Sequence, residues 1–257
     1  MLKYATSSLI GNYRIENQDR INFLQKDNFA LLLVCDGMGG HSFGDKAAQI
    51  TVDTFAQEFE KNYLVSEYPL KIELFTKSLE KTIQLAREKM KEIAKDNEAM
   101  MDMGTTLTGA FVDTFSNQIF VFNVGDSRTY VFTKKNALSQ VSIDHNLLNE
   151  LITEYNYTKK EALAVRESKN LTSGLGPLKK VKIDVFNLSE HYHKAKYLVC
   201  TTDGLHNYVT PNFFRTTLAN NDSLEQKIET LNHQALKNGS TDNLTIGIVS
   251  LEDEDEL

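Results

Sequence analysis

Three aspartates of this sequence each lie at the edge of a strongly apolar segment, and each begins or joins a turn of small residues. They stand in Asp36-Gly37-Met38-Gly39-Gly40, Asp203-Gly204 and Ser240-Thr241-Asp242-Asn243. Desolvating an ionised carboxylate at a buried strand end costs several kcal/mol unless a cation or hydrogen bonds compensate it. A fold that brings these acids together must therefore place something positive between them.

Two further aspartates, Asp19 and Asp126, share this setting beside small or amide residues. One such aspartate is more often a turn former than a ligand, but five that flank different strands favour a shared metal site. Oxygen ligands without a set of cysteines and histidines favour Mg²⁺ or Mn²⁺ over zinc. Because one Mg²⁺ usually takes only one or two carboxylates, we expect two ions.

The composition favours one large domain. The chain has 257 residues, 41% of them hydrophobic, and its three prolines are scattered with no linker-like tract. We expect a single domain over residues 1–250, followed by a solvated acidic tail at 251–257. The net charge of −7 argues against nucleic acid or an acidic membrane as a partner.

The apolar runs bear on location and on the cysteines. The longest, residues 29–35, is far too short to cross a bilayer, and the N-terminus lacks a long apolar core. We therefore expect a cytoplasmic protein without a membrane partner. Cys35 and Cys200 lie inside apolar runs, so we expect reduced core thiols rather than a disulfide or metal ligands.

The first half of the chain predicts a buried strand, two helices and a meander. Residues 28–35 form a continuous apolar run, which indicates a strand buried on both faces. From Asp45, apolar residues at helical spacing leave Glu58 for solvent, and a longer helix follows Pro69 until Gly104. These helices pack on the domain's own sheet or, alternatively, form a coiled coil with another chain. We expect the meander strands at 107–112, 118–124, 129–132 and 137–143.

The second half begins with an interruption of the strands at residues 144–171. Within it we expect a short helix at 147–152 and another that opens with the capping-box pattern of Thr158 and Glu161. A half-exposed strand at 181–185, a buried strand at 197–200, a helix at 224–235 and a strand at 244–251 follow. Strands and helices that occur in groups indicate an α+β fold.

Six motifs in a fixed order carry a resemblance to a known family. They are Arg14-Ile15-Glu16-Asn17-Gln18-Asp19, Asp36-Gly37-Met38-Gly39-Gly40-His41, Gly104-Thr105-Thr106, Val124-Gly125-Asp126-Ser127-Arg128, Thr202-Asp203-Gly204 and Asp242-Asn243. The chain resembles the bacterial branch of the metal-dependent protein phosphatases, type 2C (PPM), over residues 12–248. The resemblance implies a central antiparallel β-sandwich flanked by antiparallel helix pairs, in αββα layers, with the metal site at one end.

The resemblance also implies a role for each acid. Asp36 would bridge two ions, the Gly37 carbonyl would complete the second ion's shell, and Asp203 with Asp242 would hold the first. Asp19 would act through bound water. Asp126 together with Asp203 would hold a third, weaker ion.

Arg14 matches the phosphate-binding arginine of the family, and a planar guanidinium can take two phosphoryl oxygens. The alternative for Arg14 is a surface salt bridge. His41 either donates a proton to the leaving oxygen or positions substrate, or it merely stabilises its loop; eukaryotic relatives place a histidine at the Met38 position instead. We expect Arg128 to pair with a carboxylate and hold its loop; the alternative is a contact with substrate.

Two positions depart from the family pattern. Gln18 stands where many members have glutamate, so one contact near the second ion is neutral here. Ser173 replaces an arginine that is common just after the interruption. Without that arginine, residues 144–171, which match the family's flap, lack one expected contact with substrate.

The implied function is a metal-dependent protein serine/threonine phosphatase. A dinuclear Mn²⁺ or Mg²⁺ centre would activate a bridging water for in-line hydrolysis of phosphoserine or phosphothreonine. Residues 144–171 would be a flap that meets phosphorylated proteins, the substrates of a cognate Ser/Thr kinase, and the enzyme would be monomeric. Lys159 and Lys160 either favour acidic phosphopeptides or form a solvated helix face. Two alternatives stay open: a non-catalytic phosphoprotein-binding pseudophosphatase, and a phosphatase for a specialised regulator or a small phosphate ester.

Overall fold

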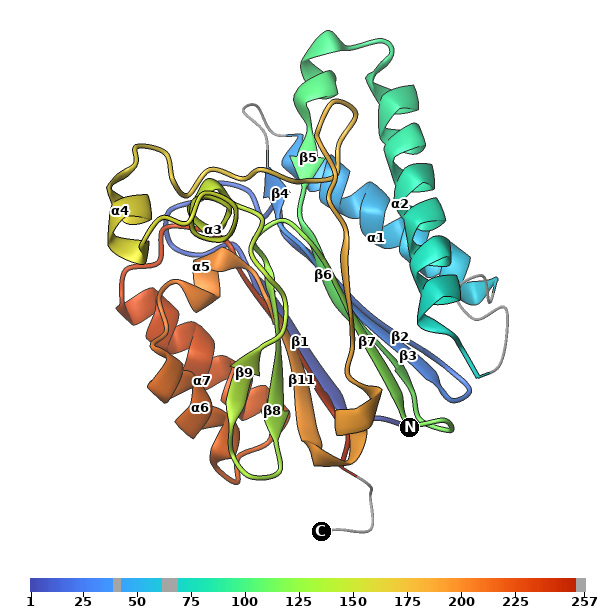
Figure 1. Ribbon diagram of the computed structural model, residues 1–257, viewed down its shortest axis with the longest axis vertical. Helices are drawn as coiled ribbons and strands as arrows, with labels where there is room; N and C mark the ends of the chain where they lie inside the picture. The colour runs from blue at the N-terminus through green and yellow to red at the C-terminus, as the bar shows by residue number, and fades with distance from the viewer. Residues whose placement is uncertain (39–42, 62–68, 253–257) are drawn as a thin grey trace.

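Two five-stranded antiparallel sheets pack face to face, with helices on both outer faces (Figure 1). This computed structural model describes residues 1–38, 43–61 and 69–252. The first sheet has the strand order β1-β12-β11-β8-β9 and the second β10-β7-β6-β3-β2. All the neighbouring strands within these sheets are antiparallel.

The strands come from both halves of the chain. The first sheet contains β1 (Tyr4–Leu9), β8 (Arg128–Thr133), β9 (Leu138–Gln140), β11 (Ala195–Thr201) and β12 (Leu244–Ser250). The second contains β2 (Arg20–Lys26), β3 (Phe29–Cys35), β6 (Leu107–Asp113), β7 (Gln118–Val124) and β10 (Asp184–Asn187). A two-stranded ribbon of β4 (Gly37–Met38) and β5 (Gly104–Thr105) extends beyond the second sheet.

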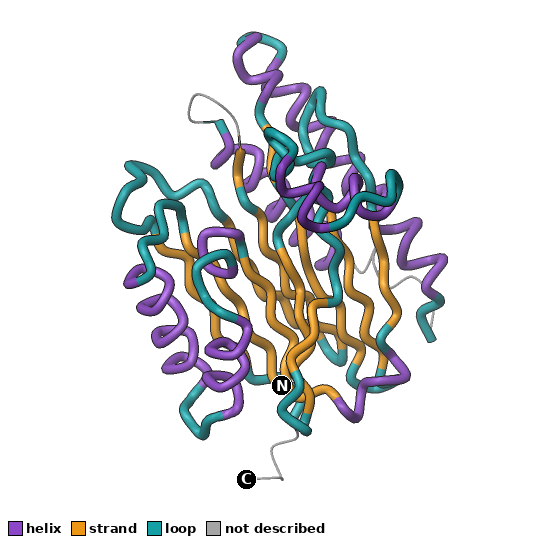
Figure 2. The backbone as a smooth tube through the Cα atoms, turned by 60° about the vertical axis from the view of Figure 1, so that its left-hand side comes forward, coloured by secondary structure: helices purple, strands orange, loops and turns teal. Residues whose placement is uncertain are grey.

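The helices divide between the two outer faces. The second sheet is covered by α1 (Gly44–Glu60) and α2 (Ile72–Ala94), and the first by α6 (Pro211–Ala219) and α7 (Leu224–Lys237). The short helices α3 (Leu147–Thr153), α4 (Lys159–Ala164) and α5 (Asp203–His206) lie toward one end of the strands, while the N-terminus lies at the other (Figures 1 and 2). Short 3-10 helices span Glu98–Asp102 and Ser189–Lys194.

β3 shows why the layers form. Leu31 and Leu33 belong to the cluster beneath α1 and α2, whereas Leu32 and Val34 pack toward Cys200 and the first sheet. Alternate residues of a strand point to opposite faces, so a continuous apolar run suits a strand buried on both. The predicted α+β sandwich with αββα layers is confirmed.

Hydroxyl groups also join the two sheets in the interior. Thr108 of β6 lies 2.8 Å from Thr129 of β8, oxygen to oxygen, and the Thr129 hydroxyl lies 3.2 Å from the Cys200 sulfur. All three side chains are fully buried. Cys35 and Cys200 are free thiols in the core, as predicted.

Several element boundaries were predicted wrongly. The helix after Pro69 ends at Ala94 rather than near Gly104, because Asn97 caps a separate 3-10 turn by accepting a hydrogen bond from Ala99 N. Glu58 is buried rather than solvated, and its carboxylate pairs with the Lys61 ammonium at 2.9 Å. The strand predicted at 181–185 is β10, which starts only at Asp184, and β9 is shorter than residues 137–143.

The strands β1, β2, β4 and β5 and the helices α5 and α6 were not predicted. No helix in the described part of the chain has the length and hydropathy that a membrane span requires.

Phe75 of α2 is the best test of the packing beneath the helix pair. Its fully buried ring lies 5.0 Å from that of Phe120 and 5.3 Å from that of Phe111, centroid to centroid. Phe75→Ala should lower the free energy of unfolding by about 3 to 5 kcal/mol because it leaves a cavity. Urea denaturation measures this. Phe115→Ala, at a side chain that is 69% exposed, is the matched control and should cost less than about 1 kcal/mol.

Candidate active site

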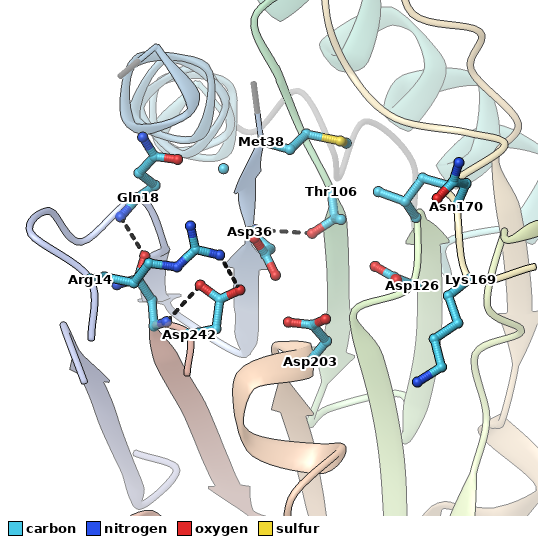
Figure 3. A pocket seen from close by; sticks show the side chains of 13 residues that line it. Arg14, Gln18, Asp36, Met38, Thr106, Asp126, Lys169, Asn170, Asp203 and Asp242 are labelled. Atoms are coloured by element: carbon cyan, nitrogen blue, oxygen red, sulfur yellow. Dashed lines mark hydrogen bonds and ion pairs between the residues drawn. The ribbon is translucent and has the colours of Figure 1, made fainter. Parts of the chain in front are cut away.

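The ends of five different segments meet around one pocket of about 560 Å³ (Figure 3). Asp36 follows β3, Asp126 lies between β7 and β8, Asp203 opens α5, and Asp242 precedes β12. Arg14 reaches the pocket from the loop between β1 and β2. The remaining lining residues are Gln18, Gly37, Met38, Thr106, Lys169, Asn170, Leu171 and Asn243.

Hydrogen bonds from threonines fix the backbone of Asp36. Its N–H donates to Thr106 Oγ1 at 2.9 Å, and its carbonyl accepts from Thr106 N at 2.9 Å and from Thr105 Oγ1 at 3.0 Å. The Thr106 hydroxyl also lies 2.7 Å from the Ser127 hydroxyl, beside Asp126. Thr106 therefore ties together the segments that carry two of the acids.

Two glycines allow the acidic turns to approach closely. Gly125, just before Asp126, has a φ of +104°, and a Cβ there would lie 2.7 Å from Thr106 Cγ2. A Cβ on Gly204 would lie 1.9 Å from the carbonyl oxygen of Asn243. Because that contact is backbone against backbone, only glycine lets the turn of Asp203 pack against the turn of Asp242.

Asn243 holds the arginine loop in place. Its amide nitrogen donates to the carbonyls of Ile10 and Glu16, at 2.9 and 3.0 Å, and its side-chain oxygen accepts from Gln18 N at 2.9 Å. Arg14 projects from this loop and donates through Nη2 to Asp242 Oδ2 at 2.6 Å. That hydrogen bond raises the pKa of Arg14.

Asp19 lies beneath the pocket rather than in its lining. Its side chain is only 2% exposed, and its carboxylate accepts a hydrogen bond from Thr202 Oγ1 at 2.8 Å. Burial raises the pKa of Asp19 to about 7. An indirect role through water therefore remains a prediction for this residue.

Arg128 does not line the pocket but anchors the strand end beside Asp126. Its Nε and Nη2 donate to the two carboxylate oxygens of Asp144, at 2.9 and 2.6 Å. The expected pairing with a carboxylate is confirmed. Asp144 also begins residues 144–171, so the same contact attaches that segment to the sandwich.

His145 also attaches the start of residues 144–171 to the sandwich, next to the contact of Arg128 with Asp144. Its ring Nδ1 accepts from the backbone N–H of Gly125 at 3.2 Å, and its Nε2 lies 2.9 Å from Asp184 Oδ2. An accepting Nδ1 carries no proton, so Nε2 holds the proton and donates it to Asp184. The buried ring thus joins the loop of Asp126 to β10.

The pocket has an excess of negative charge. Burial and the neighbouring carboxylates raise the pKa of Asp36 well above its ordinary value, and the pKa of Asp126 rises to about 7 for the same two reasons. The pKa of Asp203 is also raised, first by burial and then by Asp242. Cations in the pocket would remove this penalty by favouring the ionised carboxylates.

The donor set fits hard divalent cations. Among residues 1–38, 43–61 and 69–252, no group of three His, Cys, Asp or Glu side chains lies close enough together to bind a single ion. Mg²⁺ takes one or two carboxylates and completes its shell with water and carbonyl oxygen, so pairs of these acids suffice. The pocket supplies four carboxylates and the backbone of Gly37.

His41, Gly39 and Gly40 lie outside the described residues. Ser173 does not line the pocket. Its hydroxyl accepts a hydrogen bond from Lys182 N at 2.8 Å and donates one to the Lys182 carbonyl at 3.2 Å. Thr106, Lys169 and Asn243 had no individual role in the sequence analysis, although Thr106 and Asn243 stand inside motifs that it quoted.

Comparison with known proteins decides the family. The sequence profile described as "Protein phosphatase 2C" matches residues 13–245. The chain belongs to the protein phosphatase 2C family. The predicted family and enzyme class, a type 2C protein phosphatase, are thereby confirmed.

Individual relatives agree over almost the whole length of this phosphatase. It is 32% identical over 243 residues to the serine/threonine phosphatase stp of Listeria monocytogenes, which covers 93% of this chain and 92% of that protein. The crystal structure of Stp1 from Staphylococcus aureus superposes with a TM-score of 0.83 at 29% identity, over 98% of this chain and 96% of that one.

A third relative bears on the metal. The catalytic domain of the phosphatase PstP was solved in complex with two manganese ions, and it superposes with a TM-score of 0.77. At 23% identity, over 97% of both chains, it shows the shared fold.

In the metal-free phosphatase, burial and the neighbouring carboxylates make the ionised form of Asp126 unfavourable, and this effect on stability is measurable. The folded-state pKa of Asp126, about 7, exceeds the ordinary 3.8, so the folded protein binds more protons between these pH values. Stability is therefore lost as the pH rises toward 7. Asp126→Asn should stabilise the metal-free protein by on the order of 2 kcal/mol at pH 8, and little at pH 4.

Thermal unfolding in excess chelator at the two pH values tests this. The exposed Asp53 of α1, mutated to asparagine, provides the control and should show no such pH dependence. A melting temperature of Asp126→Asn equal to or below that of the wild type at pH 8 would contradict the raised pKa of Asp126 in the folded protein.

Proposed function

We propose that this phosphatase hydrolyses phosphoserine and phosphothreonine in proteins, using two divalent cations, Mn²⁺ or Mg²⁺. The observation that carries the proposal is the pocket itself: four carboxylates from separate segments converge on one cavity and face a single arginine loop. Bound cations would supply charge neutralisation and lower the pKa of water enough for attack on phosphorus at neutral pH.

Each acid of the site would have its own role in binding the cations. Asp36, central in the pocket, would contact both ions, Asp203 and Asp242 would hold one, and the Gly37 carbonyl would contribute to the other. Asp19 would act from below through water, and Asp126 with Asp203 would hold a weaker third ion. Gln18 lines the pocket as a neutral side chain, so the ion near Gly37 would be the more weakly held.

Arg14 would bind the phosphoryl group. Its ion pair with Asp242 is exposed enough to exchange, because the arginine side chain retains 54% of its accessible surface. Cations at Asp242 would compete for that carboxylate and free the guanidinium for two phosphoryl oxygens. The same side chain would thus serve first as counter-charge and then as substrate clamp.

Several expectations from the sequence are carried into the proposal. The substrates would be phosphoproteins produced by a Ser/Thr kinase, and the enzyme would act as a cytoplasmic monomer whose catalytic domain spans residues 1–250, with the acidic tail at 251–257. Residues 144–171 would form the flap; from here on we use that name for them. A non-catalytic role is less well supported, because each acid predicted as a ligand is present.

Loss of a central acid should abolish turnover. Asp36→Asn and Asp203→Asn should each lower kcat/KM on phosphothreonine peptides with Mn²⁺ by on the order of a thousandfold, since several kcal/mol of charge stabilisation disappears. Phosphate release with Mn²⁺, Mg²⁺ or chelator measures it. Asp53→Asn is the matched control on α1. Turnover in chelator, or full activity of Asp36→Asn, would refute the metal-dependent mechanism.

Arg14 should contribute to substrate binding. Arg14→Ala should lower kcat/KM about tenfold to hundredfold through lost charge-assisted hydrogen bonds. Arg14→Lys should retain more activity than Arg14→Ala but less than the wild type, because an ammonium cannot make the bidentate contact. Equal activity of the lysine and wild-type enzymes would argue against bidentate binding. Steady-state kinetics on one phosphopeptide suffices.

His41 remains a predicted proton donor. If it protonates the leaving serine or threonine oxygen, His41→Ala should lower kcat about a hundredfold and remove the fall in kcat that deprotonation of the donor causes at high pH. A pH–rate profile of wild type and variant tests this. An unchanged rate and profile would exclude the acid role.

A further inference from the structure

One rim of the active-site pocket is a rigid stretch of the flap. Lys169, Asn170 and Leu171 line the pocket together with the carboxylates. Their backbone is fixed from the start of α3: Leu147 N donates to the carbonyl of Asn170 at 3.0 Å and Leu148 N to that of Ser168 at 2.6 Å. Just beyond, Thr172 N donates to the carbonyl of His145 at 3.0 Å. These contacts fix the position from which the Lys169 side chain starts.

The side chain of Lys169 is exposed and has no hydrogen bond or ion pair with any other described residue. Arg14 and Arg128, by contrast, are paired with Asp242 and Asp144. Figure 3 places Lys169 on the side of the pocket opposite Arg14, beyond Asp126, with its amino group directed away from the Asp126 carboxylate. Within the described part of the chain it is therefore an unpaired positive charge that lines the pocket on a flexible side chain, while its backbone is held by the hydrogen bonds around it.

The position of Lys169 separates it from the chemistry at phosphorus. The phosphoryl group is expected between Asp36, Asp203 and Arg14, on the far side of Asp126 from Lys169. A polypeptide that delivers a phosphorylated residue there must cross the rim of the pocket. The side chains next to the phosphorylated residue would then pass the Lys169 amino group.

We propose that Lys169 is a specificity residue that selects phosphoproteins with an acidic side chain close to the phosphorylated serine or threonine. The proposal rests on the proposed function, because it assumes that a phosphopeptide occupies this pocket. Lys159 and Lys160, which the sequence analysis considered for this role, lie in α4 and do not line the pocket. A lysine suits the task because its flexible stem lets a point charge follow acids at different positions.

The expected preference is modest. An exposed ion pair typically changes affinity about twofold to fivefold, and the effect shrinks as salt screens the charges. Reversal of the charge at residue 169 should therefore reverse the preference rather than merely remove it. That sign change is what a structural role for Lys169 would not produce.

Binding of non-hydrolysable phosphopeptides tests the proposal. Two fluorescent peptides carry a phosphonate in place of the phosphothreonine ester and differ only in Asp or Lys at the adjacent position. Their Kd values with Mn²⁺ are measured by anisotropy. Wild type should bind the Asp peptide about twofold to fivefold more tightly, and Lys169→Glu should prefer the Lys peptide by a similar factor. Lys159→Glu, with the same charge change in the same flap, should keep the wild-type ratio.

The outcomes distinguish the two proposals. Equal Kd ratios in wild type and Lys169→Glu overturn the assignment, as does a Lys169→Glu variant that alters Mn²⁺ affinity with no change in the ratio. Hydrolysis of the matching phosphothreonine peptides is followed separately by phosphate release. Absence of turnover there contradicts the proposed function, while the Kd ratios still decide the role of Lys169.

Discussion

The cost of burying several carboxylates close together at one end of the two sheets is the constraint on which the site depends. Asp36, Asp126, Asp203 and Asp242 come from four separate segments, and burial raises the pKa of the first three. A sandwich interior can tolerate such a group only with positive charge between its members. Arg14 supplies one charge in this structure, and divalent cations would supply the larger part.

The elements that could be predicted were those whose residues indicate the structure within one short segment of the chain. β3 is a continuous apolar run, and α4 begins with the capping box of Thr158 and Glu161 that its sequence indicates. β1 and β2 escaped prediction because their side chains are mostly half-buried or exposed. β1 pairs with the distant strand β12, and neighbouring residues do not indicate that pairing. β2 is the edge strand of the second sheet and, among the described strands, pairs only with β3, so its side chains show no regular alternation of buried and exposed positions.

The same distinction applies to the site. The acids could be predicted because a carboxylate beside a strand end is conspicuous in any sequence. Asn243 and Lys169 could not be given roles, since their importance lies in partners far along the chain. Asn243 bonds carbonyls more than 220 positions away, at Ile10 and Glu16. Lys169 matters because Asn170 and Ser168 are hydrogen-bonded to the start of α3.

The hydroxyl contacts between the sheets determine which parts of such a fold can change in sequence without moving the acids. Hydrogen bonds between buried hydroxyls, Thr106 with Ser127 and Thr108 with Thr129, connect β6 and the residue before it to β8 and the residue before it. Sliding one sheet past the other by a residue would leave these groups unpartnered, at roughly 1 to 3 kcal/mol each. The separation between acids on opposite sheets is therefore fixed from inside. The outer helices can change sequence, or tilt on the sheets, while the acids keep their spacing.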